Sequence, residues 1–225
     1  LLQIASVLVI GFAVYFAFFY DQLTTVQTLA AEKTVISLPD NSSVVLNAAS
    51  AISYRKKNWD EQRTLKLEGE AFFKVAEGHK FDVVTSEGVV TVLGTQFNVK
   101  QRDSYFEVTC YEGIVKVTAN GNSKKLVAGD MFRLDSGILF ESSISDTGPQ
   151  WTENMSTFKT VPFSRVIAEL ERQYNITITY TGDKRMQLFS GGFSHNNLEN
   201  ALQSITSPLG LKYQMDGSTN VILFQ

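Results

Sequence analysis

The chain opens with a long apolar run. Leu1 to Tyr20 contains no charged residue. At 1.5 Å per residue a helix of this length reaches roughly 30 Å, which matches the core of a bilayer. Its aliphatic and aromatic side chains lie all around the helix and not along one stripe, as they would in a soluble amphipathic helix. We therefore predict a transmembrane helix over residues 1–20.

A cleaved signal peptide is the alternative for this run. It would need a shorter apolar region behind a basic flank, and the nearest small-residue cleavage site, Ala30-Ala31, lies well downstream. An uncleaved anchor is therefore the better interpretation. The first residue is not methionine, so we expect a fragment whose N-terminal part is missing. Residues 21–33 are predicted to be a juxtamembrane linker.

From Thr34 to Phe140 short apolar runs alternate with turn signals. Val92 and Val108 lie in runs of alternating apolar and polar residues, the period of a half-buried strand. The separating turns are rich in Gly, Asn and Asp. The turn signals are Pro39-Asp40-Asn41, Glu77-Gly78, Glu87-Gly88, Glu112-Gly113, Asn120-Gly121-Asn122, Gly129-Asp130 and Gly137. We predict an all-β domain over residues 34–140.

One motif recurs inside the all-β region: a glycine followed at fixed offsets by two apolar residues. It occurs at Gly94 with Phe97 and Val99, at Gly129 with Phe132 and Leu134, and more loosely at Gly69 and Gly113. Repetition of strand, glycine kink and strand indicates stacked corners. A short solenoid-like form is our preferred architecture, and a strongly bent sandwich is the alternative.

A second domain is predicted after a linker at 141–153, whose first residues are rich in Ser, Asp, Gly and Pro. A helix follows Pro162 and ends at Asn175, and a second helix begins at Asn196, which can cap it, and stops before Pro208. Strands are expected over 176–180, 187–193, 211–215 and 221–224.

The two halves of this second domain repeat at an offset of 35 residues. Phe163 corresponds to Leu198, Ile167 to Leu202, Leu170 to Ile205, Asn175 to Gly210, Ile176 to Leu211 and Ile178 to Tyr213. Two copies of helix, turn and strand predict a compact α+β domain with a βαβ repeat over residues 154–225.

Composition and charge exclude several classes of function. The formal net charge is −3, with 20 basic and 23 acidic residues interspersed, so no nucleic-acid partner is expected. The single cysteine, Cys110, cannot form an internal disulfide and is interpreted as a small buried residue. His79 and His195 lie in different domains, so no metal site, cofactor or catalytic residue is predicted.

Three stretches of the β region carry a family resemblance. They are Leu38-Pro39-Asp40, Leu65 to Val75 with its Gly69-Glu70-Ala71-Phe72-Phe73 core, and Val92 to Val99 with Gly94, Thr95 and Phe97. In this order they resemble the periplasmic domain of FecR-type anti-sigma factors, with Asn41 in place of a more usual glycine. The C-terminal repeat resembles the secretin and TonB short N-terminal (STN) domain.

The resemblance implies a single-pass signal transducer of the bacterial inner membrane, with most of this fragment in the periplasm. A cytoplasmic N-terminal domain, absent from this sequence, would bind an extracytoplasmic-function (ECF) sigma factor. The periplasmic part would contact the N-terminal signalling domain of a TonB-dependent outer-membrane transporter, and regulated proteolysis would follow. The resemblance implies no enzyme activity. The inducing ligand, an iron chelate or a glycan, stays open.

Two alternative functions remain open. A periplasmic structural or assembly domain related to secretin N-terminal domains would form rings. A periplasmic carbohydrate-active enzyme would need two carboxylates in a cleft. Glu68 and Glu70 lie on one face of an extended strand, and without a third polar group we interpret them as surface or turn-stabilising carboxylates.

Partner binding is expected at the last strand. Val221, Ile222, Leu223 and Phe224 form an apolar strand whose backbone could pair with a strand of the transporter domain if it lay at a sheet edge. The alternative is that this strand is internal to its sheet and only closes the core.

Overall fold

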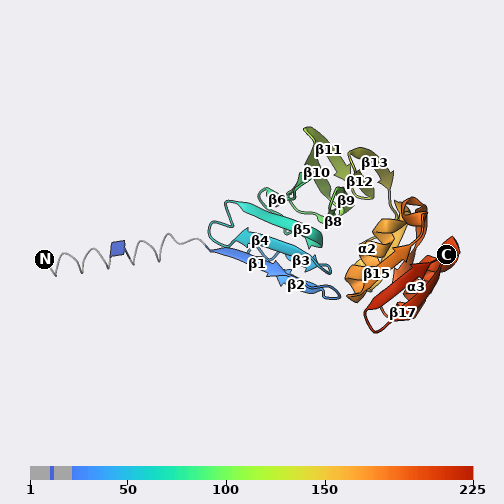
Figure 1. The fold of residues 1–225 in the computed structure, drawn as a ribbon. Coiled ribbons are helices and arrows are strands. Elements are labelled where there is room, and N and C mark those ends of the chain that lie inside the picture. The colour runs from blue at the N-terminus through green and yellow to red at the C-terminus, as the bar shows by residue number, and fades with distance from the viewer. Residues whose placement is uncertain (1–10, 13–21, 225) are drawn as a thin grey trace, which may run out of the picture.

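The computed structural model describes residues 11–12 and 22–224 (Figure 1). Apart from Gly11 and Phe12, the predicted transmembrane helix lies outside the described residues. Within the described ranges, no helix combines the length and apolar character needed to cross a bilayer. The described residues form two domains.

The first domain is all-β, as predicted. Its thirteen strands belong to one hydrogen-bonded sheet. They are β1 (Leu23–Gln27), β2 (Thr34–Ser37), β3 (Ser43–Leu46), β4 (Ala51–Arg55), β5 (Arg63–Lys74), β6 (Phe81–Val84), β7 (Gly88–Val92), β8 (Gln96–Arg102), β9 (Tyr105–Glu112), β10 (Ile114–Ala119), β11 (Asn122–Val127), β12 (Asp130–Asp135) and β13 (Ile138–Ser143).

Strand β5 divides this sheet into two halves. Its first residues pair with β4 and β6, whereas the residues from Gly69 onward pair with β8 and those from Ala71 onward also with β3. Gly69 has φ of +105°, a conformation that residues with a Cβ rarely adopt. The glycine therefore lets one strand bend from the first half of the sheet into the second.

After β5 the hairpins are added to the two halves in turn. β6–β7 and β10–β11 extend the first half, and β8–β9 and β12–β13 extend the second. Gly94, Gly113 and Gly129 lie at the crossovers between the halves, which are the corners that the repeated motif predicts. The architecture therefore corresponds to the bent-sandwich alternative, with hairpins stacked in place of the parallel coils of a solenoid.

A single hydrophobic core lies between the two halves. Phe73 stacks on Phe97 with ring centroids 5.0 Å apart and meets Phe81 edge-on. All three side chains are fully buried. Phe72 points to the opposite face of β5 and contacts Tyr111. The two phenylalanines therefore serve different surfaces of the strand, as expected for adjacent residues in a strand.

The region predicted as a juxtamembrane linker differs from the prediction. Residues 23–27 form strand β1, which pairs with β4 along its whole length. The run LTTVQ is rich in β-branched residues and alternates between exposed and half-buried positions. The first domain therefore includes this strand as well as residues 34–140.

The connection between the domains is shorter than the predicted linker. β13 extends to Ser143, and a single 3₁₀ turn, η1 (Gln150–Glu153), precedes the second domain. Trp151 in this turn is buried, and its indole N–H donates to Asn98 Oδ1 at 3.1 Å. The connection is therefore fixed to the first domain by an aromatic side chain.

The second domain has the two predicted helices and the four predicted strands, and in addition a strand before the first helix, β14 (Met155–Pro162), that the sequence patterns did not predict. Strands β14 and β16 (Leu188–Ser194) form one antiparallel pair, and β15 (Thr177–Thr181), β18 (Asn220–Phe224) and β17 (Lys212–Asp216) form a three-stranded sheet. The helices are α2 (Phe163–Tyr174) and α3 (Leu198–Thr206), with 3₁₀ turns η2 (Lys184–Met186) and η3 (Ser207–Leu209).

The internal repeat is visible in the backbone. Asn175 ends α2 in the left-handed conformation with φ of 52°, and Gly210 ends η3 in the same conformation with φ of 64°. Both residue types tolerate this conformation at a helix end. The cap of α3 is Asn197, whose side chain accepts from the Asn200 N–H. The predicted cap, Asn196, is therefore wrong by one residue.

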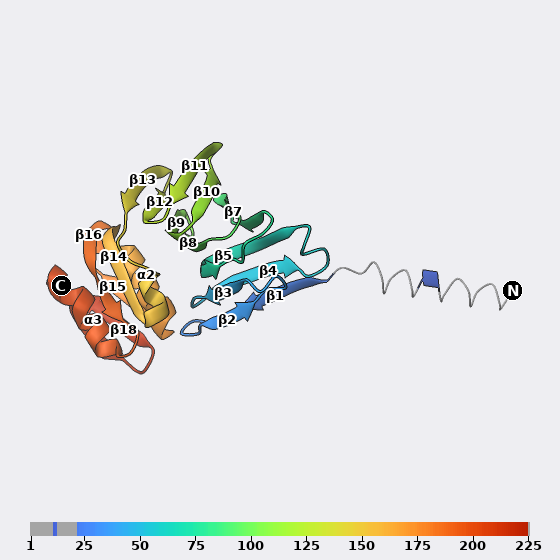
Figure 2. The ribbon, with the colours of Figure 1, turned by 180° about the vertical axis from the view of Figure 1, so that it is seen from behind.

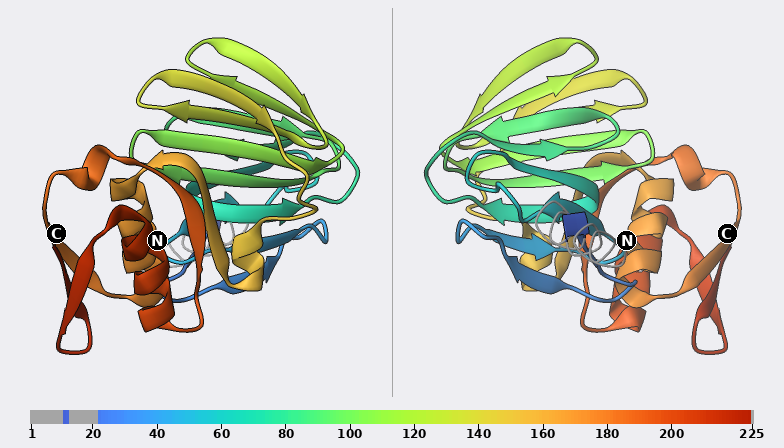
Figure 3. Two further views of the ribbon diagram at one scale, coloured as in Figure 1. Left: turned by 90° about the vertical axis from the view of Figure 1, so that its right-hand side faces the viewer. Right: turned by 90° about the vertical axis from the view of Figure 1, so that its left-hand side faces the viewer.

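The two domains pack side by side, as two opposite views show (Figures 1 and 2). Helix α2 lies on the side of the second domain that faces the first, and α3 lies farther away. The end-on views show the curved sheet of the first domain beside this smaller domain (Figure 3). The interface between them contains most of the buried charged groups described below.

Candidate functional site: the interface between the domains

Most of the signature residues that carry the family resemblance have structural roles in the first domain. Asp40 accepts from the Ser42 N–H and hydroxyl and forms an ion pair with the buried Arg63 at 2.9 Å. Pro39 is exposed in the same turn. Thr95 donates its hydroxyl to the Ile114 carbonyl at the crossover. These contacts hold the turns and corners of the sheet.

Glu68 and Glu70 differ in environment although they lie on the same face of β5. Glu68 is exposed and paired with Lys66. Glu70 is 3% exposed because the second domain covers this part of the sheet. The interpretation of Glu70 as a surface carboxylate is therefore wrong. The sequence of β5 could not show this burial, because the covering residues belong to another domain.

Lys100 on β8 connects Glu70 to the second domain. Its Nζ lies 3.3 Å from a Glu70 oxygen and 3.1 Å from a Glu169 oxygen on α2. Glu169 is 2% exposed and also pairs with Arg172 at 2.9 Å. One lysine thus joins a carboxylate of each domain.

Amide side chains complete this buried network. Asn47 and Asn98 each donate to Glu70 at 3.0 Å. Gln173 on α2 donates to Glu169 and, across the interface, to Asn47 Oδ1. Buried carboxylates with several donors of this kind avoid much of the cost of an unpaired buried charge. Lys100, Glu70, Glu169, Asn47, Asn98 and Gln173 are called the interface network below.

The charges of the network stabilise one another. Burial alone raises the pKa of Glu169, but Lys100, Arg172 and Arg102 outweigh it and hold that pKa well below the ordinary value. Burial lowers the pKa of Lys100, and the carboxylates of Glu169 and Glu70 reverse the shift, so that its pKa is raised. Lys100 and Glu169 are therefore both ionised near neutral pH.

A second set of contacts joins the β1–β2 turn to the second domain. The Lys33 ammonium donates to the Trp151 carbonyl at 2.7 Å, to Asn154 Oδ1 at 3.0 Å and to His195 Nδ1 at 2.9 Å. Since Nδ1 accepts, the imidazole proton is on Nε2 and is donated to the Ser156 hydroxyl at 2.9 Å. Burial, followed by the charge of Lys33, lowers the pKa of His195 to about 4.

A cavity of about 350 Å³ lies next to the interface network. Its walls come from the outer face of β9 and β12, from the connection and from β14. Arg133 in this wall pairs with Glu107 at 2.8 Å, and Tyr105 donates to the same carboxylate. Arg133 and Glu107 are thus paired with each other in the cavity wall.

The predicted partner strand occupies a different position from the one expected. β18 pairs with β15 on one side and with β17 on the other, so its backbone cannot accept a further strand. The hypothesis of a free edge at residues 221–224 is therefore wrong, and the structure corresponds to the alternative, a strand internal to its sheet. Val221 and Leu223 are buried in the core, whereas Ile222 and Phe224 are half-exposed on the outer face.

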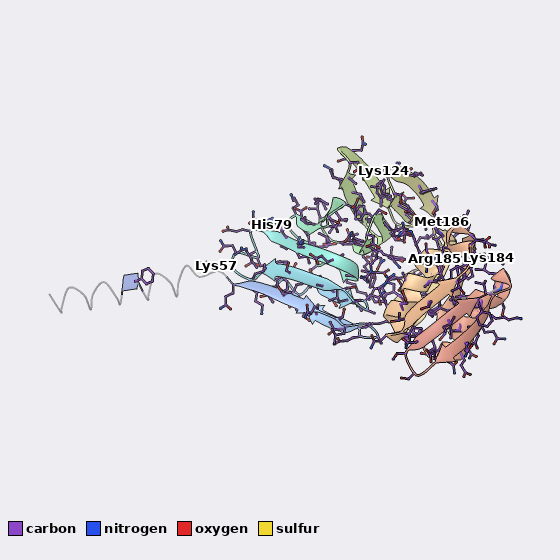
Figure 4. All side chains as sticks on the ribbon, in the orientation of Figure 1. Lys57, His79, Lys124, Lys184, Arg185 and Met186 are labelled. Atoms are coloured by element: carbon purple, nitrogen blue, oxygen red, sulfur yellow. The ribbon has the colours of Figure 1, made fainter. Side chains whose placement is uncertain are left out.

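The remaining candidate groups do not converge. His79 lies at the end of the first domain that points away from the second domain, on which Lys184, Arg185 and Met186 lie (Figure 4). Among the described residues no cluster of metal-ligating side chains occurs. Cys110 is fully buried, and burial raises the pKa of its thiol to about 11. It is a small core residue, as predicted.

Comparison with known proteins matches both domains to one family. Residues 24–116 match the model of the FecR protein family, and residues 156–222 match the model of the FecR C-terminal region. Both domains are of the FecR type. The match to the first domain begins within β1, in agreement with the structure.

Solved structures resemble nearly the whole FecR-type chain. A crystal structure of a candidate anti-sigma factor from Parabacteroides distasonis ATCC 8503 has a TM-score of 0.83 and 28% identity, covering 91% of this chain and 99% of that one. A second, with the same description, has a TM-score of 0.82 and 27% identity, covering 90% and 99%. No curated protein matches the chain. These findings support an anti-sigma factor role and a sigma factor as a kind of partner.

Sequence reasoning missed most of the interface of this FecR-type chain. Lys100, Glu169 and Gln173 occupy positions that a single strand or helix would expose to solvent. The spacing of Glu169 and Gln173 places them on one face of α2, but this spacing is common on exposed helices. Only the packing of the second domain against β8 shows that this polar face is buried.

Proposed function

We propose that this chain is the sensing part of a FecR-type anti-sigma factor. The sigma factor, of the ECF class, would bind a cytoplasmic domain N-terminal to this sequence. The observation that carries the proposal is the pair of FecR-type domains, similar in fold over nine-tenths of the chain to candidate anti-sigma factors. The buried interface network gives the two domains a way to influence each other.

The location follows from the predicted anchor. Residues 1–20 would cross the bacterial inner membrane once, and the two domains would lie in the periplasm. In this arrangement β1 begins directly after the membrane segment. Regulated proteolysis in or near the membrane would then release the sigma factor.

The external signal would come from the N-terminal signalling domain of a TonB-dependent outer-membrane transporter. The βαβ repeat supports the finer likeness of the second domain to STN domains. We place the docking surface on the outer face of the β15–β18–β17 sheet. There Ile222 and Phe224 form a half-exposed apolar stripe between exposed polar residues such as Thr179 and Gln214. A stripe of this kind can contribute the apolar centre of an interface.

The test is a titration of the full chain, held in detergent, against the signalling domains of transporters encoded beside its gene. Saturable one-to-one binding to one of them is expected. Ile222→Lys should weaken that binding at least tenfold, because it places a charge in the centre of the apolar stripe. Isothermal titration calorimetry measures both quantities.

The matched control is Val35→Lys, which changes an exposed β-branched residue of the first domain. This variant should bind like the unchanged chain. Equal loss in both variants would contradict the docking surface, and absence of binding to any signalling domain would contradict the transporter as partner. Ring-shaped oligomers of the chain would favour a structural or assembly role.

A further inference from the structure

The turn between β1 and β2 is attached to helix α2 of the other domain. The Ala31 N–H donates to the Arg172 carbonyl at 2.7 Å. Arg172 lies in the last turn of α2, where carbonyl groups have no partner within the helix, and the Ile176 N–H that would otherwise reach it donates to Glu171. A residue close to the start of the first domain therefore caps a helix of the second.

Lys33 strengthens this attachment from the same turn. Its three acceptors belong to η1 and to the residues that flank β14 and β16, none of them in the sheet of the first domain. The side chain is half-buried, and burial lowers its pKa. Without these acceptors, water molecules would have to replace the three protein partners of the ammonium group.

The two strands that flank this turn do not pair with each other and have few contacts of their own. β1 pairs only with β4, and β2 pairs only with β3. Neither strand contains a fully buried residue, and only Val26 and Ile36 pack against the core. Segments with little buried apolar surface open at lower free energy than the rest of a domain.

The base of the turn is anchored to a loop that also belongs to the interface. Thr28 donates its hydroxyl to the Asn47 carbonyl at 2.6 Å, and its N–H to the Ser50 carbonyl. Asn47 in turn bonds to Gln173 of the second domain. One attachment of the turn is therefore made to α2 itself, and the other is made within the first domain, at a loop that contacts α2 through the Asn47 side chain.

We propose that the β1–β2 segment, Leu23–Ser37, is a latch that the second domain holds closed. Movement of the second domain away from the first removes the acceptor of Ala31 and two of the three acceptors of Lys33, those on Asn154 and His195. The latch then opens while the strands of the core stay paired. A change at the C-terminal end of the chain thereby reaches the residues directly after the predicted membrane segment. This inference rests on the proposed function for its biological use, but opening of the latch is a property of this chain alone.

Amide hydrogen exchange of the unchanged full chain in detergent tests the latch directly. The Ala31 amide reports separation of the domains, because its acceptor belongs to α2. We expect the protected amides of β1 and β2 to exchange at the same rate as Ala31 and with the same dependence on low denaturant, and those of β8 and β9 to exchange much more slowly. Rapid exchange of Ala31 beside fully protected β1 amides would overturn the proposal.

Two variants and one control make the test specific. Lys33→Met keeps the volume of the side chain and removes its charge, and Lys100→Met weakens the interface without changing a residue of the latch. Each should speed exchange in β1 and β2 by tenfold or more relative to β8 and β9. Lys66→Met, which removes an exposed ion pair of the first domain, should change the exchange rates neither of β1 and β2 nor of β8 and β9.

Equal acceleration of all strands, or none in β1 and β2, would refute the latch. Because no transporter domain is present in these measurements, their outcome is independent of the binding titration. Failure of the proposed partner and failure of the latch are therefore distinguishable.

Discussion

Gly69 shows how much one residue can determine in this fold. A Cβ added there would lie 2.4 Å from the Ser50 hydroxyl oxygen and 2.8 Å from the Ser50 Cα. The close neighbour is partly backbone, so it cannot rotate away. The glycine is needed both for its φ of +105° and for the space that it leaves.

We expect Gly69→Ala to destabilise the first domain by about 3 kcal/mol or more, the sum of backbone strain and steric overlap. Denaturant unfolding measures the change. Gly121→Ala is the matched control: its φ is +75°, and nothing lies within 4 Å of the added Cβ. Strain alone should cost about 1 kcal/mol there. Equal costs at both sites would mean that the contact with Ser50 is relieved by movement of the chain.

His195 makes stability depend on pH. Its pKa is about 4 in the folded chain and about 6.5 when unfolded. The folded state therefore binds fewer protons between these values, and stability present above pH 6.5 is lost as the pH falls toward 4. Because the imidazole is only partly buried, we expect the loss to be about 1 kcal/mol.

The pH dependence is checked by comparing unfolding free energies at pH 7 and pH 4.5. His195→Gln should lose less stability than the unchanged chain over this interval, since the amide does not titrate. His79→Gln, at an exposed position of the first domain, should behave like the unchanged chain. A profile that His195→Gln leaves unaltered would assign the acid sensitivity to carboxylates instead.

At the scale of elements, β8 and α2 depend on each other through charge. The two elements contribute Lys100 and Glu169, which are joined at 3.1 Å within a largely buried contact. A buried ion pair contributes modestly compared with an apolar pair of similar shape, but removing one partner leaves the other charge buried. We therefore expect the stability of the chain to fall when one charged residue of the interface network is replaced, and to fall much less when all its charged residues are replaced together.

Lys100→Met should destabilise the chain by about 3–5 kcal/mol, because Glu70 and Glu169 lose their shared cation. The triple variant with Glu70→Gln and Glu169→Gln should recover most of this loss. Lys66→Met, whose ion pair is exposed, should cost under about 1 kcal/mol. Denaturant unfolding of the three variants measures the effect. A triple variant no more stable than Lys100→Met would show that the lysine acts by packing and not by charge.

At the scale of the whole molecule, the two domains are joined at four places. Trp151 fixes the connection, the interface network joins the centre, and Lys33 attaches the β1–β2 turn. Arg165 of α2 also pairs with Asp135 of β12. Because these contacts are polar, the cost of separating the domains depends on whether water or a partner replaces the lost hydrogen bonds. A docking partner on the second domain can thus shift the closed and open states if it binds them with different affinity.

The sequence by itself determined the elements and much of their order. Period-two runs and turn residues located most strands, and helical spacing located α2 and α3, because these patterns reflect contacts within or beside one element. The repeated glycine motif located the corners of the sheet, since a left-handed or crowded backbone position favours glycine wherever it occurs. The 35-residue repeat gave the plan of the second domain.

Only the tertiary structure decided which polar residues are buried and which strand is an edge. Glu70, Lys100 and Glu169 lie at positions that their own strand or helix would expose to solvent, and their burial comes from elements that lie far apart in the chain. β1 was predicted as a linker because its pairing with β4 is not encoded in its own five residues. From its sequence β18 could be an edge strand, but in the structure β15 and β17 pair with it on both sides. Contacts between distant segments depend on how whole elements pack, and the pattern of residues within one element does not predict them.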